Sequence, residues 1–170
     1  AESVTHEGRM IQLVRGPAGI GKTRLITEAV GGITAPVVWV RCWDDTGPLW
    51  AWEQVLDQLG CTGHRTGGTT GPERSDQGDR LDRFTLLVKE LRSVARAVDR
   101  AVGRVVGRVV VVIDDAHLCD HSSLLFTRFL ARARPSVDVL VIVTARSGDD
   151  VDHARRAELE ELAREADEFV

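Results

Sequence analysis

The chain has 170 residues, of which 43% are hydrophobic and 28% charged, and its formal net charge is −4. This balance is typical of one globular domain, and the negative charge excludes the broad basic surface expected for direct binding to nucleic acid or an anionic membrane. No apolar run approaches the roughly 18 residues of a membrane span, and the first residues lack a secretory signal pattern. Three widely spaced cysteines fit a reducing compartment. We therefore expect a cytoplasmic protein without direct contacts to membrane or nucleic acid.

The first part of the chain alternates expected strands and helices. The apolar runs at 10–14 and 37–40 predict buried strands, each flanked by a glycine or a proline. Apolar residues at helical spacing predict helices over 22–30 and 48–59. Between 61 and 78 the composition changes to Gly, Thr, Ser and Pro, which predicts a flexible surface loop.

A strongly amphipathic helix is predicted next, over 81–102. Its apolar residues recur at steps of three and four: Leu81, Phe84, Val88, Leu91, Ala95, Val98 and Val102. Such a stripe indicates one face turned toward the core. A partner-binding helix or a short coiled coil is the alternative, although the heptads run barely three deep.

The last part of the chain continues the alternation. The Val-rich run 109–113 suits a central parallel strand that is covered on both faces. A helix over 122–133, a strand over 137–143 and a charged helix over 151–166 follow, and 168–170 resembles the start of a further strand. This order predicts an α/β fold, with a parallel sheet between helices on both faces. Ligands of such sheets bind at the carboxyl ends of the strands.

The first strand leads into a phosphate-binding motif. Residues 16–23 read GPAGIGKT and match G-x-x-x-x-G-K-[ST] in full, between an expected strand and an expected helix. Glycines let successive backbone N–H groups face an anion, and the helix N-terminus adds its dipole. The expected nucleotide-binding residues are Gly16, Pro17, Ala18, Gly19, Ile20, Gly21, Lys22, Thr23 and Arg24.

The motif assigns separate roles to its last two residues. Lys22 is expected to reach the β- and γ-phosphates, and the Thr23 hydroxyl to bind Mg²⁺. The alternative is a Gly-rich turn with a solvated lysine. The motif predicts a P-loop NTPase three-layer sandwich that binds a nucleoside triphosphate with Mg²⁺.

Two carboxylates follow the Val-rich strand. Asp114 is expected to hold Mg²⁺ through water, and Asp115 to orient or deprotonate the attacking water. Because the Asp115 side chain is one methylene shorter than Glu, we expect slow hydrolysis. An acidic turn at a strand end is the alternative interpretation.

An arginine ends the next strand in the segment Thr144-Ala145-Arg146. A guanidinium at this position can contact the γ-phosphate with two parallel hydrogen bonds. Arg146 is therefore a candidate catalytic residue, together with Lys22 and Asp115. In a chain this rich in arginine, an ordinary surface residue is the alternative.

Two other groups of residues receive a structural interpretation. His117, Cys119 and His121 alternate in sequence, but no second ligand pair with metal spacing accompanies them, so we expect a loop that leads into a helix capped by Asp120 or Ser122. Four tryptophans cluster after the second strand: Trp39, Trp43, Trp50 and Trp52. They could stack on an adenine, but packing in the core or against a partner is the favoured role.

Four segments, in order and spacing, resemble one family. Residues 13–25 (LVRGPAGIGKTRL), 39–52 (WVRCWDDTGPLWAW), 113–117 (IDDAH) and 144–146 (TAR) are similar to AAA-like ATPase domains of the signal-transducing STAND class. Such domains occur in large ATP-binding LuxR-type transcriptional regulators. The chain departs from the family in having Leu118 where a tryptophan is common, and in lacking a Gly-Arg-Glu segment before the first strand.

The resemblance implies an ASCE/AAA-like core that uses ATP as a switch, with residues 1–170 as a single P-loop domain cut from a longer protein. The expected partners are helical, winged-helix and effector domains of the same protein beyond a C-terminal truncation, and further copies in a nucleotide-dependent assembly. Two alternatives stay open at this point. One is a conventional P-loop enzyme, such as a small-molecule kinase or a mechanical ATPase, and the other is a non-hydrolysing interaction module.

Overall fold

The computed structural model describes residues 10–61, 77–102, 109–133, 138–148 and 151–170. Within them, five strands form one parallel sheet in the order β2-β3-β4-β1-β5. The strands are β1 (Ile11–Gly16), β2 (Val37–Arg41), β3 (Val109–Asp114), β4 (Val139–Arg146) and β5 (Asp167–Phe169). All the strands expected from the sequence are therefore present, with ends that differ by at most three residues.

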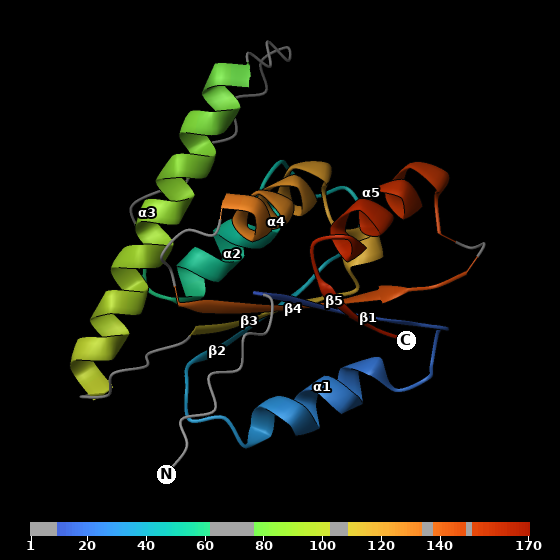
Figure 1. The fold of residues 1–170 in the computed structure, drawn as a ribbon, viewed down its shortest axis with the longest axis horizontal. Helices are drawn as coiled ribbons and strands as arrows, with labels where there is room; N and C mark the ends of the chain where they lie inside the picture. The colour runs from blue at the N-terminus through green and yellow to red at the C-terminus, as the bar shows by residue number, and fades with distance from the viewer. Residues whose placement is uncertain (1–9, 62–76, 103–108, 134–137, 149–150) are drawn as a thin grey trace.

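Helices cover both faces of the sheet (Figure 1). They are α1 (Lys22–Gly31), α2 (Trp50–Gln58), α3 (Gln77–Val102), the 3₁₀ turn η1 (Ala116–Leu118), α4 (His121–Ala133) and α5 (His153–Ala163). Helix α1 lies on one face, and α2, α3, α4 and α5 lie on the other. The predicted three-layer α/β sandwich is confirmed.

The sheet separates two hydrophobic cores, because successive side chains of a strand point to opposite faces. Every residue of β3 is buried. Val111 and Ile113 of this strand belong to the larger core under α2 to α5, whereas Val112 belongs to the smaller core with Ile26 and Val30 of α1. A strand buried on both faces needs a continuous apolar run, which explains the Val-rich sequence.

Strand register brings the residues at the ends of four strands to one edge of the sheet. Gly16 at the end of β1 lies opposite Arg146 of β4, and Arg41 at the end of β2 lies opposite Asp114 of β3. Since all the strands are parallel, these residues share the carboxyl edge.

Helix α3 differs in part from its prediction. It begins at Gln77, so the last two residues of the predicted 61–78 loop are helical, while 62–76 lie outside the described residues. Phe84, Leu91 and other members of the apolar stripe are buried as expected, but Leu81 is 54% exposed. The reason is that the first turns of α3 extend past the neighbouring helices. The side chains of the last two stripe residues, at 98 and 102, lie outside the described residues.

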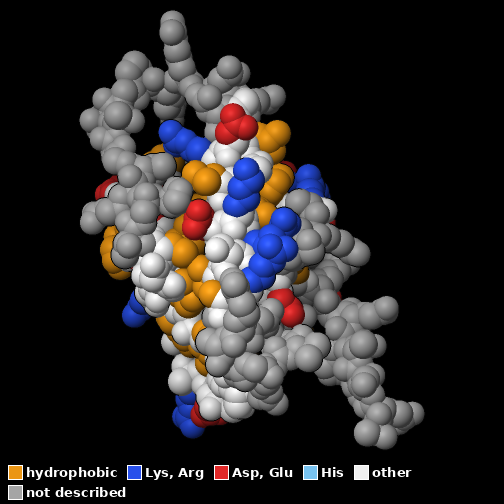
Figure 2. All heavy atoms as spheres, turned by 90° about the vertical axis from the view of Figure 1, so that its left-hand side faces the viewer, with side chains coloured by type: hydrophobic (Ala, Val, Ile, Leu, Met, Phe, Trp, Pro, Cys, Tyr) orange, Lys and Arg blue, Asp and Glu red, His pale blue; other side chains and the backbone are white. Residues whose placement is uncertain are grey.

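The side of the molecule that carries α3 exposes hydrophobic side chains among Lys and Arg side chains (Figure 2). Among the side chains of this helix that the structure describes, Leu81 and Leu86 are the large exposed hydrophobic ones. Across the described part of the chain, none of the helices combines the length and the apolar character that crossing a membrane requires.

Candidate functional site

The loop between β1 and α1 has the backbone geometry that its glycines predict. Gly19 and Gly21 have φ angles of 75° and 100°, in the left-handed region that glycine adopts most readily. Gly21 is the N-cap of α1, and no acidic side chain lies in the first turn. A Cβ on Gly16 would lie 3.2 Å from Cγ2 of Ile20, so the loop curls tightly over its own start. This exposed loop at a helix N-terminus suits an anion.

Lys22 lies over the same loop. Its ammonium group donates hydrogen bonds of 2.9 Å to the backbone carbonyls of Gly16 and Pro17. The Lys22 side chain is thus directed back toward the curled backbone instead of outward along α1. A positive charge at this position complements phosphate oxygens held by the loop amides.

Asp114 joins the phosphate loop to the centre of the sheet. Asp114 is buried, with only 2% of its surface exposed. The Thr144 hydroxyl donates to Oδ1 of Asp114 at 2.6 Å, and the Thr23 hydroxyl lies 3.3 and 3.2 Å from Oδ1 and Oδ2. One carboxylate and two hydroxyls are therefore brought together by two strands, β3 and β4, and the helix α1.

The donor set fits Mg²⁺. This ion prefers oxygen ligands, and in P-loop proteins it is held by the loop Ser/Thr hydroxyl and the carboxylate at the end of a neighbouring strand. Thr23 and Asp114 occupy the corresponding positions and could hold the ion, and the structure brings them within 3.3 Å of each other. Their closeness fits a small cation shared with a nucleotide phosphate.

Asp115 lies next to this pair but in a different setting. Its backbone has a φ of 57°, so the chain turns sharply after β3, and its N–H donates to the Thr144 hydroxyl at 3.0 Å. Its carboxylate pairs with Arg41 at the end of β2, with both Nε and Nη2 3.2 Å from Oδ2. Side-chain exposure is 18% for Asp115 and 73% for Arg41.

Arg41 is a residue that the sequence analysis missed. The strand containing it was expected to stop at residue 40, one residue before the arginine. An arginine at a strand end was a usable signal, but its partner depends on β2 lying beside β3, which no local pattern shows.

The two arginines of the predicted site have different surroundings. Arg24 pairs with Glu28 one turn farther along α1, at 2.9 Å, and both side chains are exposed. Arg146 is half-buried at the end of β4, where its backbone lies opposite Gly16. The register thus places Arg146 beside the start of the phosphate loop.

The His117, Cys119 and His121 segment forms the predicted passage into a helix. His121 contacts Glu158 of α5, and Cys119 is buried. A hydrogen bond with the Cys42 thiol, together with burial, raises the pKa of Cys119 well above its usual value. Within the described ranges, no three His, Cys, Asp or Glu side chains lie close enough to hold a metal ion.

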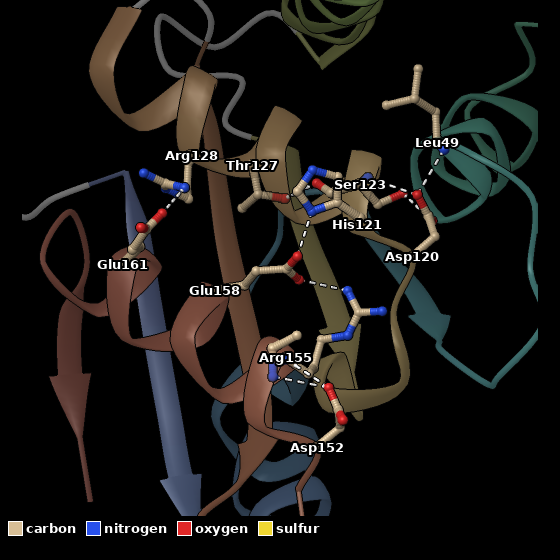
Figure 3. A network of polar contacts seen from close by, with 11 residues as sticks. Leu49, Asp120, His121, Ser123, Thr127, Arg128, Asp152, Arg155, Glu158 and Glu161 are labelled. Atoms are coloured by element: carbon tan, nitrogen blue, oxygen red, sulfur yellow. Dashed lines mark hydrogen bonds and ion pairs between the residues drawn. The ribbon is translucent and has the colours of Figure 1, made fainter. Parts of the chain in front are cut away.

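Asp120 connects the loops that follow β2 and β3 (Figure 3). Its carboxylate accepts hydrogen bonds from the Ser123 N–H at 2.8 Å and the Ser123 hydroxyl at 2.6 Å, which confirms it as the cap of α4. Oδ1 also accepts from the Leu49 N–H at 2.8 Å. Leu49 precedes α2 and has a φ of 64°. One carboxylate therefore holds the starts of α2 and α4.

The tryptophans divide between core and surface. Trp52 is fully buried, and its indole N–H donates to the Ser123 carbonyl and the Thr127 hydroxyl at 3.2 and 3.1 Å. Trp43 is 55% exposed and packs against Trp50, with ring centroids 4.4 Å apart. Trp52 is therefore a core residue, as the favoured interpretation of the tryptophans predicts.

Comparisons with known proteins give a family and several solved structures, but no match among curated proteins. A structure of Drosophila ORC bound to AT-rich DNA and Cdc6 is similar at 8% identity and a TM-score of 0.48, covering 94% of this chain and 48% of that one. The Aeropyrum pernix ORC1 protein in complex with DNA is similar at 16% identity and a TM-score of 0.45, covering 94% and 38%. A Pyrococcus horikoshii OT3 protein is similar at 12% identity and a TM-score of 0.38, covering 94% and 80%.

The chain thus spans less than half the length of the first two of these proteins. A family model described as an AAA ATPase domain matches residues 2–143, which include the phosphate loop and all residues of β3. This match covers most of the 170 residues. The chain belongs to the AAA ATPase domain family.

Proposed function

We propose that this chain is an ATP-binding, slowly hydrolysing nucleotide switch domain of a signal-transducing or transcriptional regulator. The observation that carries the proposal is the meeting of Thr23, from the phosphate loop, with the buried Asp114 at 3.2 to 3.3 Å. A glycine-rich turn with a solvated lysine does not require this carboxylate. Membership of the AAA ATPase family supports nucleotide binding, typically with Mg²⁺. ATP is preferred to GTP because of the resemblance to STAND domains.

In this proposal each residue has one task. The loop amides and Lys22 bind the phosphates, and Thr23 and Asp114 hold Mg²⁺, which neutralises charge on the phosphate oxygens. Asp115 accepts the proton of the attacking water. Arg146 approaches the γ-phosphate from the end of β4, since its backbone lies opposite Gly16.

The ion pair between Arg41 and Asp115 supports slow turnover. The guanidinium holds the Asp115 carboxylate toward β2, at 3.2 Å from both Nε and Nη2. A carboxylate held in an ion pair must leave it, or share it, before it can orient water. ATP and ADP favour different conformations only through their different contacts with the protein. Slow hydrolysis therefore keeps a switch in its ATP-bound conformation for longer.

The domain arrangement is part of the proposal. Residues 1–170 form a single P-loop core, and helical, winged-helix and effector domains of the same protein respond to its nucleotide state. Self-assembly in the ATP state is a further expectation. No direct contact of this segment with nucleic acid is proposed.

A second candidate function is a nucleotide-binding module that does not hydrolyse. The same Arg41–Asp115 ion pair favours it, because a permanently paired Asp115 cannot serve as a base. A conventional P-loop enzyme, such as a small-molecule kinase, has no specific observation in its favour among the described residues.

Equilibrium binding of a fluorescent ATP analogue with Mg²⁺ tests the proposal. Lys22→Ala should weaken binding at least about tenfold, because a charge-assisted contact contributes roughly 1.5–3 kcal/mol. Lys89→Ala is the matched control, since Lys89 is exposed on α3 and is the other lysine of the chain. Equal binding by the wild type and Lys22→Ala would show that the nucleotide, if bound, lies elsewhere.

Hydrolysis then separates the two candidates. Slow phosphate release by the wild type, lost in Asp115→Asn with binding retained, supports the hydrolysing switch. Phosphate release no faster in the wild type than in Asp115→Asn supports the non-hydrolysing module.

A further inference from the structure

Two cysteines that are far apart in the sequence meet beyond the carboxyl ends of β2 and β3. Cys42 directly follows β2, and its N–H donates to the Asp114 carbonyl at 2.9 Å. After β3 the chain turns through η1, and the Cys119 N–H donates to the Ala116 carbonyl at 3.1 Å. The two thiols form a hydrogen bond with each other. Two neighbouring strands and one turn therefore bring two sulfur atoms into contact.

Both thiols are enclosed by the larger hydrophobic core. Cys42 is 3% exposed and Cys119 is 1% exposed, and both belong to the core under α2 to α5. Neither cysteine is in a disulfide, and Cys61, the third cysteine of the chain, lies after α2. Any small apolar side chain could fill either position, so packing alone gives no reason for two thiols in contact. The pair can, however, do what a single cysteine cannot, which is to form a disulfide within the domain.

Oxidation of such a pair by hydrogen peroxide proceeds in two steps. The sulfur of one cysteine attacks the O–O bond, which breaks, so that a sulfenic acid forms and one water molecule leaves. The sulfur of the second cysteine attacks the sulfenic sulfur, the S–S bond forms, and the S–O bond breaks to release a second water molecule. The two thiols lose two electrons and two protons, and the peroxide that accepts them becomes two molecules of water.

The surroundings of the pair set the speed of each step. The hydrogen bond with Cys42, together with burial, raises the pKa of Cys119, so little thiolate is present and the first step is slow. Local opening of the surface loops is enough to admit a molecule as small as peroxide. The second step is fast, because the other thiol already lies against the sulfenic sulfur. Rapid closure also protects that sulfur from irreversible oxidation to the sulfinic acid.

A disulfide at this position would join the two segments that carry the Arg41–Asp115 ion pair. Cys42 follows Arg41 in the chain, and Cys119 lies in the turn that begins at Asp115. The guanidinium and the carboxylate of the ion pair are 3.2 Å apart. A covalent bond between the two cysteines would therefore hold the end of β2 against the end of β3, beside this ion pair.

We propose that Cys42 and Cys119 are a redox-active pair, which a hydroperoxide converts to a disulfide that locks the loop after β2 to the turn after β3. In the reduced form only non-covalent contacts join these segments. In the oxidised form Arg41 is kept beside Asp115, and hydrolysis of ATP is slower. This effect on hydrolysis rests on the proposed function, whereas formation of the disulfide does not.

Peptide mapping of the native protein after treatment with hydrogen peroxide tests the pair. Non-reducing mass spectrometry should find the peptides of Cys42 and Cys119 joined, with two hydrogen atoms fewer than the separate peptides, and a phosphine reductant should part them. Cys61→Ala is the matched control and should form the same disulfide. Cys42→Ala and Cys119→Ala should each lose it. Far-ultraviolet circular dichroism of every variant checks that it is folded.

Urea denaturation measures the lock. The oxidised wild type should unfold at a higher urea concentration than the reduced wild type, because the cross-link restricts the unfolded chain. Peroxide-treated Cys42→Ala should show no such rise. The proposal is overturned if the folded, treated wild type keeps both thiols, or if either thiol becomes a sulfinic acid or joins Cys61 or another molecule instead. An unchanged urea midpoint of the oxidised form would overturn the lock.

Single-turnover phosphate release measures the effect on hydrolysis. The rate in the oxidised wild type should fall by up to about fivefold, the factor by which an exposed ion pair can act, and should recover after reduction. Equal rates in the two forms, with the disulfide proven by peptide mapping, would overturn this effect. Absence of hydrolysis already in the reduced wild type would count against the proposed function and leave the disulfide to be decided by the peptide map.

Discussion

At the scale of single residues, two adjacent carboxylates have been given different surroundings. Asp114 is buried and receives hydrogen bonds from the hydroxyls of Thr144 and Thr23, whereas Asp115 lies at a turn and pairs with the largely exposed Arg41. A buried carboxylate surrounded by hydroxyls suits a fixed ligand of a cation. A carboxylate with an exposed and replaceable partner suits a group that changes its contacts during a cycle.

Replacing Arg41 tests whether its ion pair restrains hydrolysis. Arg41→Gln should raise the rate of ATP hydrolysis by up to roughly fivefold, because an exposed ion pair contributes about 0.2–1 kcal/mol and its loss releases the Asp115 carboxylate. Single-turnover phosphate release measures the rate. The Arg132→Gln variant, which breaks an exposed ion pair away from the site, should leave it unchanged. A lower rate in Arg41→Gln would instead mean that the arginine assists hydrolysis.

Thr144 offers a second test at this scale. The residue is fully buried, donates to Asp114 and accepts from the Asp115 N–H. Thr144→Val keeps the shape but removes the hydroxyl. It should lower the free energy of unfolding by about 1–3 kcal/mol, because the buried Asp114 carboxylate and the half-buried Asp115 N–H each lose a partner.

Urea denaturation gives this free energy. Thr85→Val is the matched control, since Thr85 is exposed on α3 and its hydroxyl donates to the Leu81 carbonyl of the same helix. Equal stability of the two variants would argue that Asp114 and Asp115 find other partners. Mg²⁺-dependent nucleotide binding should also weaken in Thr144→Val and stay unchanged in Thr85→Val.

At the scale of elements, the order and type of the helices and strands could be predicted because their signals are local. The Val-rich run of β3, the glycines around α1 and the stripe of α3 each act within a few residues. The contacts that join elements could not be predicted in this way. Arg41 with Asp115, and Asp120 with Leu49, lie 74 and 71 residues apart in the sequence. These contacts can be predicted only after β2 and β3 are known to be neighbouring strands.

Asp120 provides the prediction at this scale. Asp120→Ala removes the cap of α4 and the acceptor of the Leu49 N–H, so it should lower the free energy of unfolding by about 2–3 kcal/mol. Asp152→Ala is the comparison, because Asp152 caps only α5, through the N–H groups of Ala154 and Arg155, and should cost about 1 kcal/mol. Chemical denaturation of both variants measures the difference. A smaller loss for Asp120→Ala than for Asp152→Ala would contradict the linking role of Asp120.

At the scale of the whole molecule, the strand order β2-β3-β4-β1-β5 puts β4 between the strands that carry the phosphate loop and Asp114. Alternating strands and helices predict a parallel sheet but not this order, because several orders satisfy the same alternation. The order matters for function. It places Thr144 of β4 in contact with Asp114, and Arg146 of β4 opposite Gly16, so one strand touches both halves of the site.

The reactivity of the three cysteines can show whether the molecule is folded. Cys42 follows β2 and Cys119 follows β3, and both are buried, whereas Cys61 follows α2 and is partly exposed. Burial and the Glu90 carboxylate raise the pKa of Cys61, which slows but does not prevent its reaction. In the native protein at pH 8, a thiol reagent should therefore modify Cys61 first, and Cys42 and Cys119 only as the molecule unfolds. Mass spectrometry of timed samples identifies each site.

Nucleotide and pH should change this unfolding in opposite directions. Mg²⁺–ATP at about one hundred times its dissociation constant should stabilise the fold by roughly 2.7 kcal/mol and slow modification of Cys42 and Cys119 accordingly.

The pKa of Cys119 is raised in the folded state, so its contribution to stability is present below the ordinary thiol pKa of 9.0 and is lost as the pH rises above it. A Cys119→Ala variant should lose less stability between pH 8 and 10 than the wild type.

The Lys22→Ala variant is the control for protection by nucleotide. Protection of Cys42 by ATP in the wild type, absent in Lys22→Ala, would link the stability of the whole fold to the phosphate loop. Equal protection in both variants would place the stabilising ligand at another site.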